Sequence, residues 1–156
     1  MLESKIIMDI RELREGELPE LLDLYKHLHE EDDILPANEV VDGIWKDITD
    51  SENFRYFGVF TDDGHLLSSC TISIIPNLTR GARPYGLIEN VVTSKKERRK
   101  GFGTKLLQHV QEAAWDVGCY KVMLLTGRKD ESTLRFYEKA GFHPHVKTGF
   151  ISYPPE

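Results

Sequence analysis

The residues best suited to chemistry lie between Glu89 and Lys105, in the stretch ENVVTSKKERRKGFGTK. A strand-like run is followed by five basic residues among six, then by Gly101 and Gly103, and then by a helical pattern. A helix N-terminus offers free backbone N–H groups, and glycine lets an anion approach because it lacks Cβ and tolerates positive φ. The spacing therefore predicts a phosphate-binding turn. A solvated basic turn before an ordinary helix is the alternative.

Two common nucleotide-binding patterns are absent from this turn. The order Thr104-Lys105 is the reverse of the order in a P-loop, and the glycine spacing differs as well. The dinucleotide pattern G-x-G-x-x-G fails because Leu106 occupies the position of the third glycine. The turn therefore argues against a nucleoside triphosphatase and against a dinucleotide-binding domain.

Composition limits the partners of this turn. The chain has 156 residues and a net charge of −6, with 40% hydrophobic and 29% charged residues, which is typical of one globular domain spanning residues 1–156. Acidic chains bind nucleic acid poorly, since such binding requires many phosphates to be neutralised. Nothing resembles a signal peptide or a membrane span, and Cys70 and Cys119 read as buried free thiols. We expect a cytoplasmic protein that binds a small anion, with neither nucleic acid nor membrane as partner.

Hydrophobic periodicity predicts the elements that must position the turn. Strands are expected at 4–13, at two places within 54–76 joined by Asp62-Asp63-Gly64, at 87–94, at 119–126 and in the strand-like remainder 141–153. Helices are expected at 16–31, at 37–51 with Asn38 as a cap, at 103–118 and at 131–140. This order indicates an α+β, three-layer α/β/α fold with four helices on a mixed, mainly antiparallel central sheet of six or seven strands.

Two segments together resemble a known family. Arg98-Arg99-Lys100-Gly101-Phe102-Gly103 matches the R/Q-x-x-G-x-G/A signature of the GNAT superfamily of acyl-CoA N-acyltransferases. LRFYEKAGF, residues 134–142, is similar to that family's F/L-Y-E-K-x-G-F segment and follows the next strand, as in the family. The resemblance covers residues 86–142 well and residues 5–85 only in element order. IENVV, GCYKV and FYEKAGF lean toward the glucosamine-6-phosphate N-acetyltransferase branch, although that branch has an aspartate where this chain has Thr126-Gly127-Arg128.

The resemblance implies a GNAT-like fold with acetyl-CoA held in a splay between the strands at 89–93 and 120–125. The diphosphate would rest on backbone amides of residues 99–104, and the pantetheine arm on residues 91–93. Lys95, Lys96, Arg98 or Lys100 could reach the adenosine phosphates. Asp130 replaces an asparagine of many relatives, with Ser132 and Thr133 close by. The implied acetyl-CoA-binding residues are Val91, Val92, Thr93, Arg98, Arg99, Lys100, Gly101, Phe102, Gly103, Thr104 and Ser132.

The same resemblance implies two catalytic residues. Tyr137 matches the family tyrosine that faces the CoA sulfur; a phenol near pKa 10 can protonate a thiolate whose conjugate thiol has a pKa of about 8.5 almost without free-energy change. The alternative is a core aromatic on the face shared with Leu134 and Ala140. Glu89 is the candidate base, acting directly or through water. A carboxylate is a poor base for an alkylammonium, so the amine must arrive neutral or burial must raise the carboxylate pKa. The alternative is a glutamate that bonds to a neighbouring strand.

The remaining polar residues predict less. His27 and His29 point to different helix faces, and His143-Pro144-His145 has no carboxylate or cysteine at ligand spacing, so no metal is expected. The acidic run 30–33 could attract a cationic amine, or it is a solvated helix end.

Three functions stay open on the sequence alone. The first is N-acetyl transfer from acetyl-CoA to a primary amine of a small-molecule acceptor. The others are a non-catalytic or regulatory CoA-binding module and a small interaction domain. Since members of this family commonly dimerise, a homodimer is an open alternative to a monomer.

Overall fold

The computed structural model describes residues 8–156. Its strands are β1 (Met8–Glu12), β2 (Phe54–Thr61), β3 (Leu66–Ile75), β4 (Tyr85–Thr93) and β5 (Val122–Leu124). Its helices are α1 (Leu18–Tyr25), α2 (Asn38–Asp50), α3 (Phe102–Asp116) and α4 (Glu131–Lys139), with short 3-10 turns η1 (Glu15–Glu17) and η2 (Lys95–Glu97). Strands β1 to β4 pair antiparallel in chain order, and β5 joins β4 in parallel.

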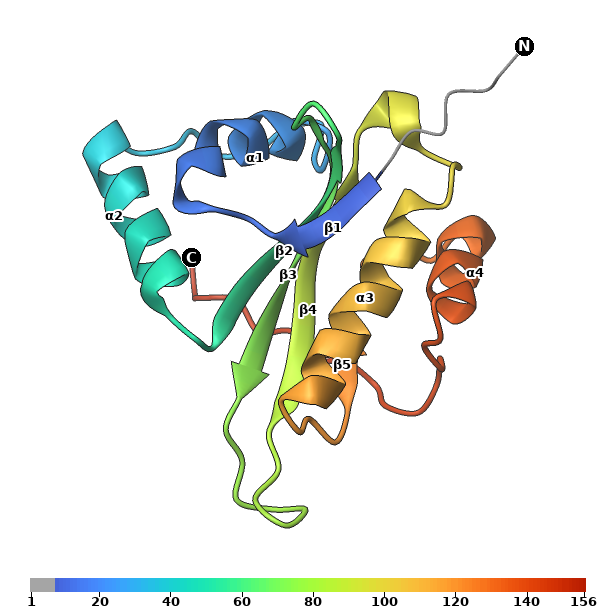
Figure 1. Cartoon of the computed structure of the whole chain (residues 1–156). Coiled ribbons are helices and arrows are strands. Elements are labelled where there is room, and N and C mark those ends of the chain that lie inside the picture. The colour runs from blue at the N-terminus through green and yellow to red at the C-terminus, as the bar shows by residue number, and fades with distance from the viewer. Residues whose placement is uncertain (1–7) are drawn as a thin grey trace.

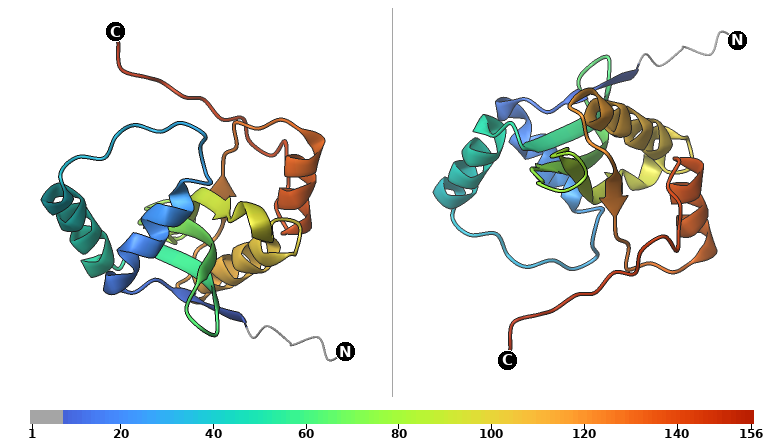
Figure 2. Two further views of the ribbon diagram at one scale, coloured as in Figure 1. Left: turned by 90° about the horizontal axis from the view of Figure 1, so that it is seen from above. Right: turned by 90° about the horizontal axis from the view of Figure 1, so that it is seen from below.

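The helices cover both faces of this sheet, as the sequence predicted. Figure 1 shows α1 and α2 on one face and α3 and α4 on the other, and Figure 2 shows the same layers end-on. Alternate side chains of β2 supply the two cores: Val59 packs with Leu106 of α3, whereas Phe60 packs with Leu21 of α1 and with Trp45. The result is the expected α+β fold with a mixed sheet.

The expected number of strands, six or seven, is wrong for the part of the chain that is described, where the sheet has five. The strand-like remainder 141–153 forms no strand. Pro144 removes a backbone donor, His145 has a left-handed φ of 65°, and the side chains from His143 to Tyr153 are exposed. Figure 2 shows this tail leaving the body of the molecule. Of the expected first strand, residues 4–7 lie outside the described residues.

The first helix is also shorter than its periodicity suggests. It ends at Tyr25, and residues 26–28 continue as a turn whose N–H groups donate to carbonyls three residues back. The four acidic residues at 30–33 repel one another and do not favour a continued helix. Asn38 is the first residue of α2, and Ala37 precedes it, so the expected cap is displaced by one position. The early end of α1 leaves the segment 27–29 outside a helix, and His27 contacts the basic turn.

Candidate active site

The central feature of the site is the place where β4 and β5 separate. Their parallel pairing comprises Gly86 with Val122, Leu87 with Met123, and Ile88 with Leu124, and it ends there. A cavity of about 860 Å³ opens beyond this point. Residues 88–93 of β4 line it, together with residues 124–128, the basic turn, the start of α3 and the inner face of α4. The splay expected between the strands is thus an open cavity.

A bulge in β4 faces this cavity. Asn90 has a left-handed φ of 53°, and the pairing of β3 with β4 shifts register between Ser69 and Thr71. A bulge leaves an extra residue out of the hydrogen-bond ladder and redirects the strand. Asn90 and the preceding Glu89 both line the cavity. Backbone groups of β4 are thereby released from the sheet beside the open volume.

The start of α3 forms the other end of the cavity. Gly101 precedes the helix with a φ of 85°, and no side chain caps the helix N-terminus. The first intrahelical bond runs from the N–H of Lys105 to the carbonyl of Gly101, at 3.1 Å. The N–H groups of Phe102, Gly103 and Thr104 therefore have no partner within the helix. A Cβ on Gly101 would point into open space, which an anion can use.

The second glycine of the motif allows α3 and α4 to pack closely against each other. Gly103 is buried, and a Cβ there would lie 3.0 Å from Cζ of Phe136 on α4. A side chain at this position would push α4 away from α3. Gly101 thus gives access to the helix N-terminus, and Gly103 lets the two helices approach each other.

The basic residues of the turn differ in whether their side chains already have hydrogen-bond or salt-bridge partners. Arg98 donates from Nε to the carbonyl of Thr93 at 3.2 Å and from Nη2 to the carbonyl of His27 at 2.9 Å. Lys100 pairs with Glu97 at 2.7 Å and does not line the cavity. Arg99 lines the cavity, and no acidic side chain of residues 8–156 forms a salt bridge with it. Of these cations, Arg99 is the one free to meet an anion in the cavity.

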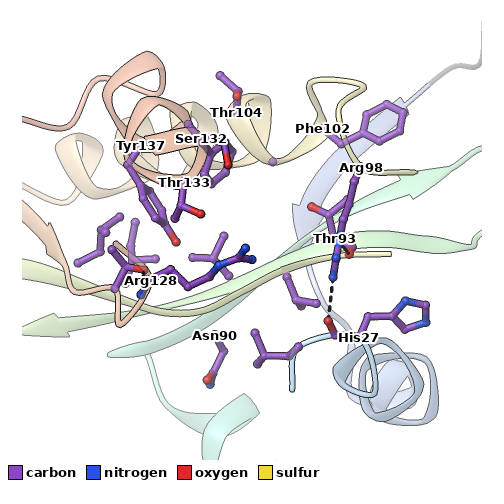
Figure 3. A pocket seen from close by; sticks show the side chains of 18 of the residues that line it. His27, Asn90, Thr93, Arg98, Phe102, Thr104, Arg128, Ser132, Thr133 and Tyr137 are labelled. Atoms are coloured by element: carbon purple, nitrogen blue, oxygen red, sulfur yellow. Dashed lines mark hydrogen bonds between the residues drawn. The ribbon is translucent and has the colours of Figure 1, made fainter. Parts of the chain in front are cut away.

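Tyr137 lies at the opposite end from the turn. Figure 3 shows it beside Thr133 and Arg128, whereas Arg98, Phe102 and His27 lie at the far end. Burial raises the pKa of the Tyr137 phenol; Cys70 and Glu89 raise it further, and Arg128 opposes them. The phenol therefore keeps its proton at neutral pH, and it borders the cavity as a proton donor.

Asp130 fixes the loop that leads to Tyr137. Its carboxylate caps α4 by accepting from the N–H of Thr133 at 3.1 Å and from that residue's hydroxyl at 2.8 Å. It also accepts from the Ser132 hydroxyl at 2.7 Å and from Arg128 Nε at 3.1 Å. The bonds from Ser132 and Thr133, with the charge of Arg128, hold the pKa of Asp130 well below its usual range. Asp130 thus serves as a structural cap.

Comparison with known proteins agrees with this geometry. The sequence profile of the acetyltransferase (GNAT) family matches residues 10–142. The chain belongs to the GNAT acetyltransferase family.

Individual relatives of this acetyltransferase match along nearly their whole length. A glucosamine 6-phosphate N-acetyltransferase of Trypanosoma brucei brucei is 34% identical over 146 residues, covering 90% of this chain and 92% of the relative. A protein assigned as an acetyltransferase from Agrobacterium tumefaciens has a solved structure that matches with a TM-score of 0.86 and 40% identity, over 94% of this chain and 99% of that one. An acetyltransferase structure from Trypanosoma brucei matches with a TM-score of 0.77 and 30% identity, over 94% and 100%. The chain is accordingly an acetyl-CoA-dependent N-acetyltransferase.

Most residues that the sequence singled out meet in the cavity of this acetyltransferase. Glu89, Tyr137 and the expected acetyl-CoA-binding residues all line it, with the exception of Lys100. Sequence reasoning missed His27 and Asn90 as lining residues, and it treated Arg128 only as a departure from a family pattern. The residue types of β4 give no sign of the bulge or of the left-handed conformation of Asn90. His27 reaches the turn only because α1 ends early.

Two further findings concern residues 8–156 of this acetyltransferase. None of their helices is long and apolar enough to cross a bilayer. No three of their histidine, cysteine, aspartate or glutamate side chains are grouped closely enough to hold a metal ion.

Proposed function

We propose that this acetyltransferase transfers the acetyl group of acetyl-CoA directly to a primary amine of a small-molecule acceptor. The observation that supports this best is the cavity itself, which has unpartnered amides of α3 at one end and the protonated phenol of Tyr137 at the other. The α3 amides at the first end are suited to bind a diphosphate, and the phenol at the second end is suited to protonate a thiolate leaving group. The two ends belong to one continuous volume of about 860 Å³.

The donor end has the chemistry of a diphosphate site. The amides of Phe102, Gly103 and Thr104 and the positive end of the α3 dipole would bind the diphosphate, and Arg99 would add charge. The backbone of Val91 to Thr93 would hold the pantetheine arm along the open edge of β4. Lys100 is a weaker candidate, since Glu97 already neutralises it.

The end of the cavity near Tyr137 would position the thioester and the amine and would donate one proton. The acceptor nitrogen forms a bond to the thioester carbonyl carbon, and the bond from that carbon to sulfur breaks. Tyr137 donates its phenolic proton to the departing thiolate, and the proton that the amine loses passes to Glu89 or to water. Backbone N–H groups released by the bulge at Asn90 are suited to stabilise the carbonyl oxygen as it gains charge.

The cysteines support direct transfer over a covalent acyl-enzyme. Burial raises the pKa of the Cys70 thiol to about 12, so this sulfur stays protonated and is a poor nucleophile. Cys119 is also buried, and neither cysteine lines the cavity. The positions of both cysteines thus support attack by the amine on the thioester itself.

The acceptor to test first is glucosamine 6-phosphate, because the relative at 34% identity is named for it. Arg128 and Arg135 line the cavity; each pairs with an acidic neighbour, Asp130 and Glu131 respectively, and each guanidinium has further N–H donors for an acceptor phosphate. The experiment measures thiol release from acetyl-CoA with glucosamine 6-phosphate, glucosamine, an aminoglycoside, polyamines, amino acids and a peptide N-terminus. We expect release with at least one primary amine.

Two other outcomes of this experiment are informative. Absence of acetyl-CoA binding at millimolar ligand, measured by isothermal titration, would remove the proposed function. Tight binding without thiol release across the whole panel would favour a regulatory CoA-binding module instead.

A further inference from the structure

A contact between two walls of the cavity has no role in the function proposed so far. The Nδ1 atom of His27 accepts a hydrogen bond from the backbone N–H of Lys95 at 3.0 Å. The backbone carbonyl of His27 accepts a second bond, from Nη2 of Arg98 at 2.9 Å, which Figure 3 shows as a dashed line. His27 thus joins the end of α1 to the basic turn through both its ring and its backbone.

The two segments joined in this way line adjoining parts of the same cavity. His27, Leu28 and His29 border it from the α1 side, whereas Arg98 and Arg99 border it from the turn. Arg98 also donates to the carbonyl of Thr93, the last residue of β4. Hydrogen bonds therefore hold the turn between β4 and α3 to the end of β4 and to the segment after α1. Helix α3 begins directly after this turn.

The amide of Lys95 depends on this contact. Lys95 is the first residue of η2, and the bond that closes η2 runs from the N–H of Glu97 to the carbonyl of Ser94 at 2.8 Å. The Lys95 N–H has no acceptor within that 3-10 turn. The imidazole of His27 provides one.

We propose that His27 is a positioning residue for acetyl-CoA binding: its neutral imidazole holds the basic turn in the conformation that directs the α3 amides into the cavity. This inference rests on the proposed function, since it takes the turn as the place where the diphosphate binds. His27 acts through Lys95 and Arg98 and needs no contact with the reacting atoms.

Protonation removes the contact. An imidazole nitrogen accepts a hydrogen bond only while it keeps its lone pair, and both nitrogens of imidazolium are donors. Histidines change charge within about pH 5 to 8. The charges near His27 are Asp23 on α1 and Lys26 just after it, which pair with each other at 2.9 Å. The facing segment adds Lys95, Glu97, Arg98 and Lys100. Acid should therefore weaken acetyl-CoA binding by loosening the turn.

Three variants test this role through the Kd of acetyl-CoA, measured by isothermal titration at pH 8 and pH 5.5. His27→Asn places a carbonyl oxygen close to the position of Nδ1 and accepts at both pH values. His27→Leu cannot accept. His65→Leu is the matched control, because His65 is an exposed histidine on the β2–β3 turn and lies outside the cavity.

At pH 8 we expect His27→Leu to bind acetyl-CoA about two- to tenfold more weakly, the range that one neutral hydrogen bond supports. His27→Asn and His65→Leu should bind like the wild type. At pH 5.5 the wild type should lose affinity relative to His27→Asn, because only the asparagine still offers an acceptor once the imidazole is protonated. Phosphate titration of the ligand is common to both proteins and cancels in that ratio. In His27→Leu the loss should fall on the Kd of acetyl-CoA more than on kcat, whereas His65→Leu should leave both unchanged.

Wild-type affinity in His27→Leu at pH 8, or the same pH dependence in His27→Asn as in the wild type, would overturn the inference. If His27→Leu does not fold, the comparison of wild type with His27→Asn across pH decides alone. A wild type that binds no acetyl-CoA at either pH contradicts the proposed function itself, so the two failures are distinguishable.

Discussion

Tyr137 combines three properties that a proton donor needs: it borders the cavity, it is partly buried, and burial raises its pKa. The Tyr137→Phe variant should lower kcat by about a hundredfold or more, the scale of general acid catalysis, with little change in KM for acetyl-CoA. The reason is that the proton matters only as the thiolate departs. Steady-state kinetics with the preferred amine measures both constants.

The control for this prediction is Tyr153→Phe, which changes an exposed tyrosine of the C-terminal tail outside the cavity. It should leave both constants unchanged. Equal losses of acetyl-CoA affinity and turnover in Tyr137→Phe would mean that the ring serves packing, for which its contacts with Phe136 and Phe142 are suitable.

If the amine reaches the cavity protonated, Glu89 must take its proton before the nitrogen can attack. The Glu89→Gln variant should then lower kcat/KM for the amine about tenfold or more at pH 7, while the Kd of acetyl-CoA stays the same. The deficit should shrink as pH rises toward the pKa of the amine near 10, because solvent then supplies the neutral form. Glu138→Gln on α4, outside the cavity, is the control. A deficit that is constant with pH would exclude the base role.

At the scale of elements, the two ends of α3 provide a matched test of the diphosphate site. Gly101 and Gly118 both have positive φ, at 85° and 86°, and a Cβ at either meets no atom within 4 Å. Valine at either position should therefore strain the backbone alike, by roughly 1–3 kcal/mol. Only Gly101→Val should weaken acetyl-CoA binding, by about tenfold or more, because its side chain enters the approach to the α3 amides. Calorimetry of folding and of binding separates the two effects, and equal binding by both variants contradicts the site.

The cap of α4 gives a pH-dependent prediction. The pKa of Asp130 is lowered in the folded state, so the stabilisation that its charge provides is present above the unfolded value of about 4 and is lost as pH falls. Asp130→Ala should therefore lower the melting temperature at pH 7, and the difference from wild type should shrink below pH 4. Thermal melts at pH 7 and pH 2 measure this, because the stabilisation is lost only as pH falls toward the lowered pKa of the folded state. Asp42→Ala, at an exposed position of α2, should show no such convergence.

A feature of the structure could be predicted from the sequence when it leaves a pattern in neighbouring residues, and could not when it depends on residues far apart in the chain. Gly101 and Gly103 stand out because glycine next to a helical pattern has few local explanations, and the helix at α3 follows from its own apolar stripe. The contact between His27 and Lys95 spans 68 positions, and no periodicity reports it. The left-handed conformation of Asn90 belongs to a bulge in the pairing of β4 with β3, and the residues of β4 alone do not indicate it.

At the scale of the whole molecule, the error in strand number has a similar cause. Apolar residues in 141–153 suggest a strand, but a strand exists only where a neighbour accepts its hydrogen bonds, and the tail leaves Phe150 91% exposed. The layers, by contrast, follow from faces that each element buries, such as the alternating side chains of β2. The sequence therefore predicts which face an element can bury more reliably than it predicts whether another element packs or pairs with it.

The whole-molecule consequence of the splay is that β5 is joined to the antiparallel part of the sheet by three residue pairs. Amides of β5 and α4 should open locally more often than those of the central strand β3. Acetyl-CoA that spans the cavity would contact β4, α3 and α4 together, and should slow local exchange in β5 and α4 about tenfold or more. Fraying amides of β1, at the far edge of the sheet, should keep their rates. Hydrogen exchange followed by mass spectrometry with and without acetyl-CoA measures this, and an equal slowing at β1 and β5 would show that the ligand does not bridge the splay.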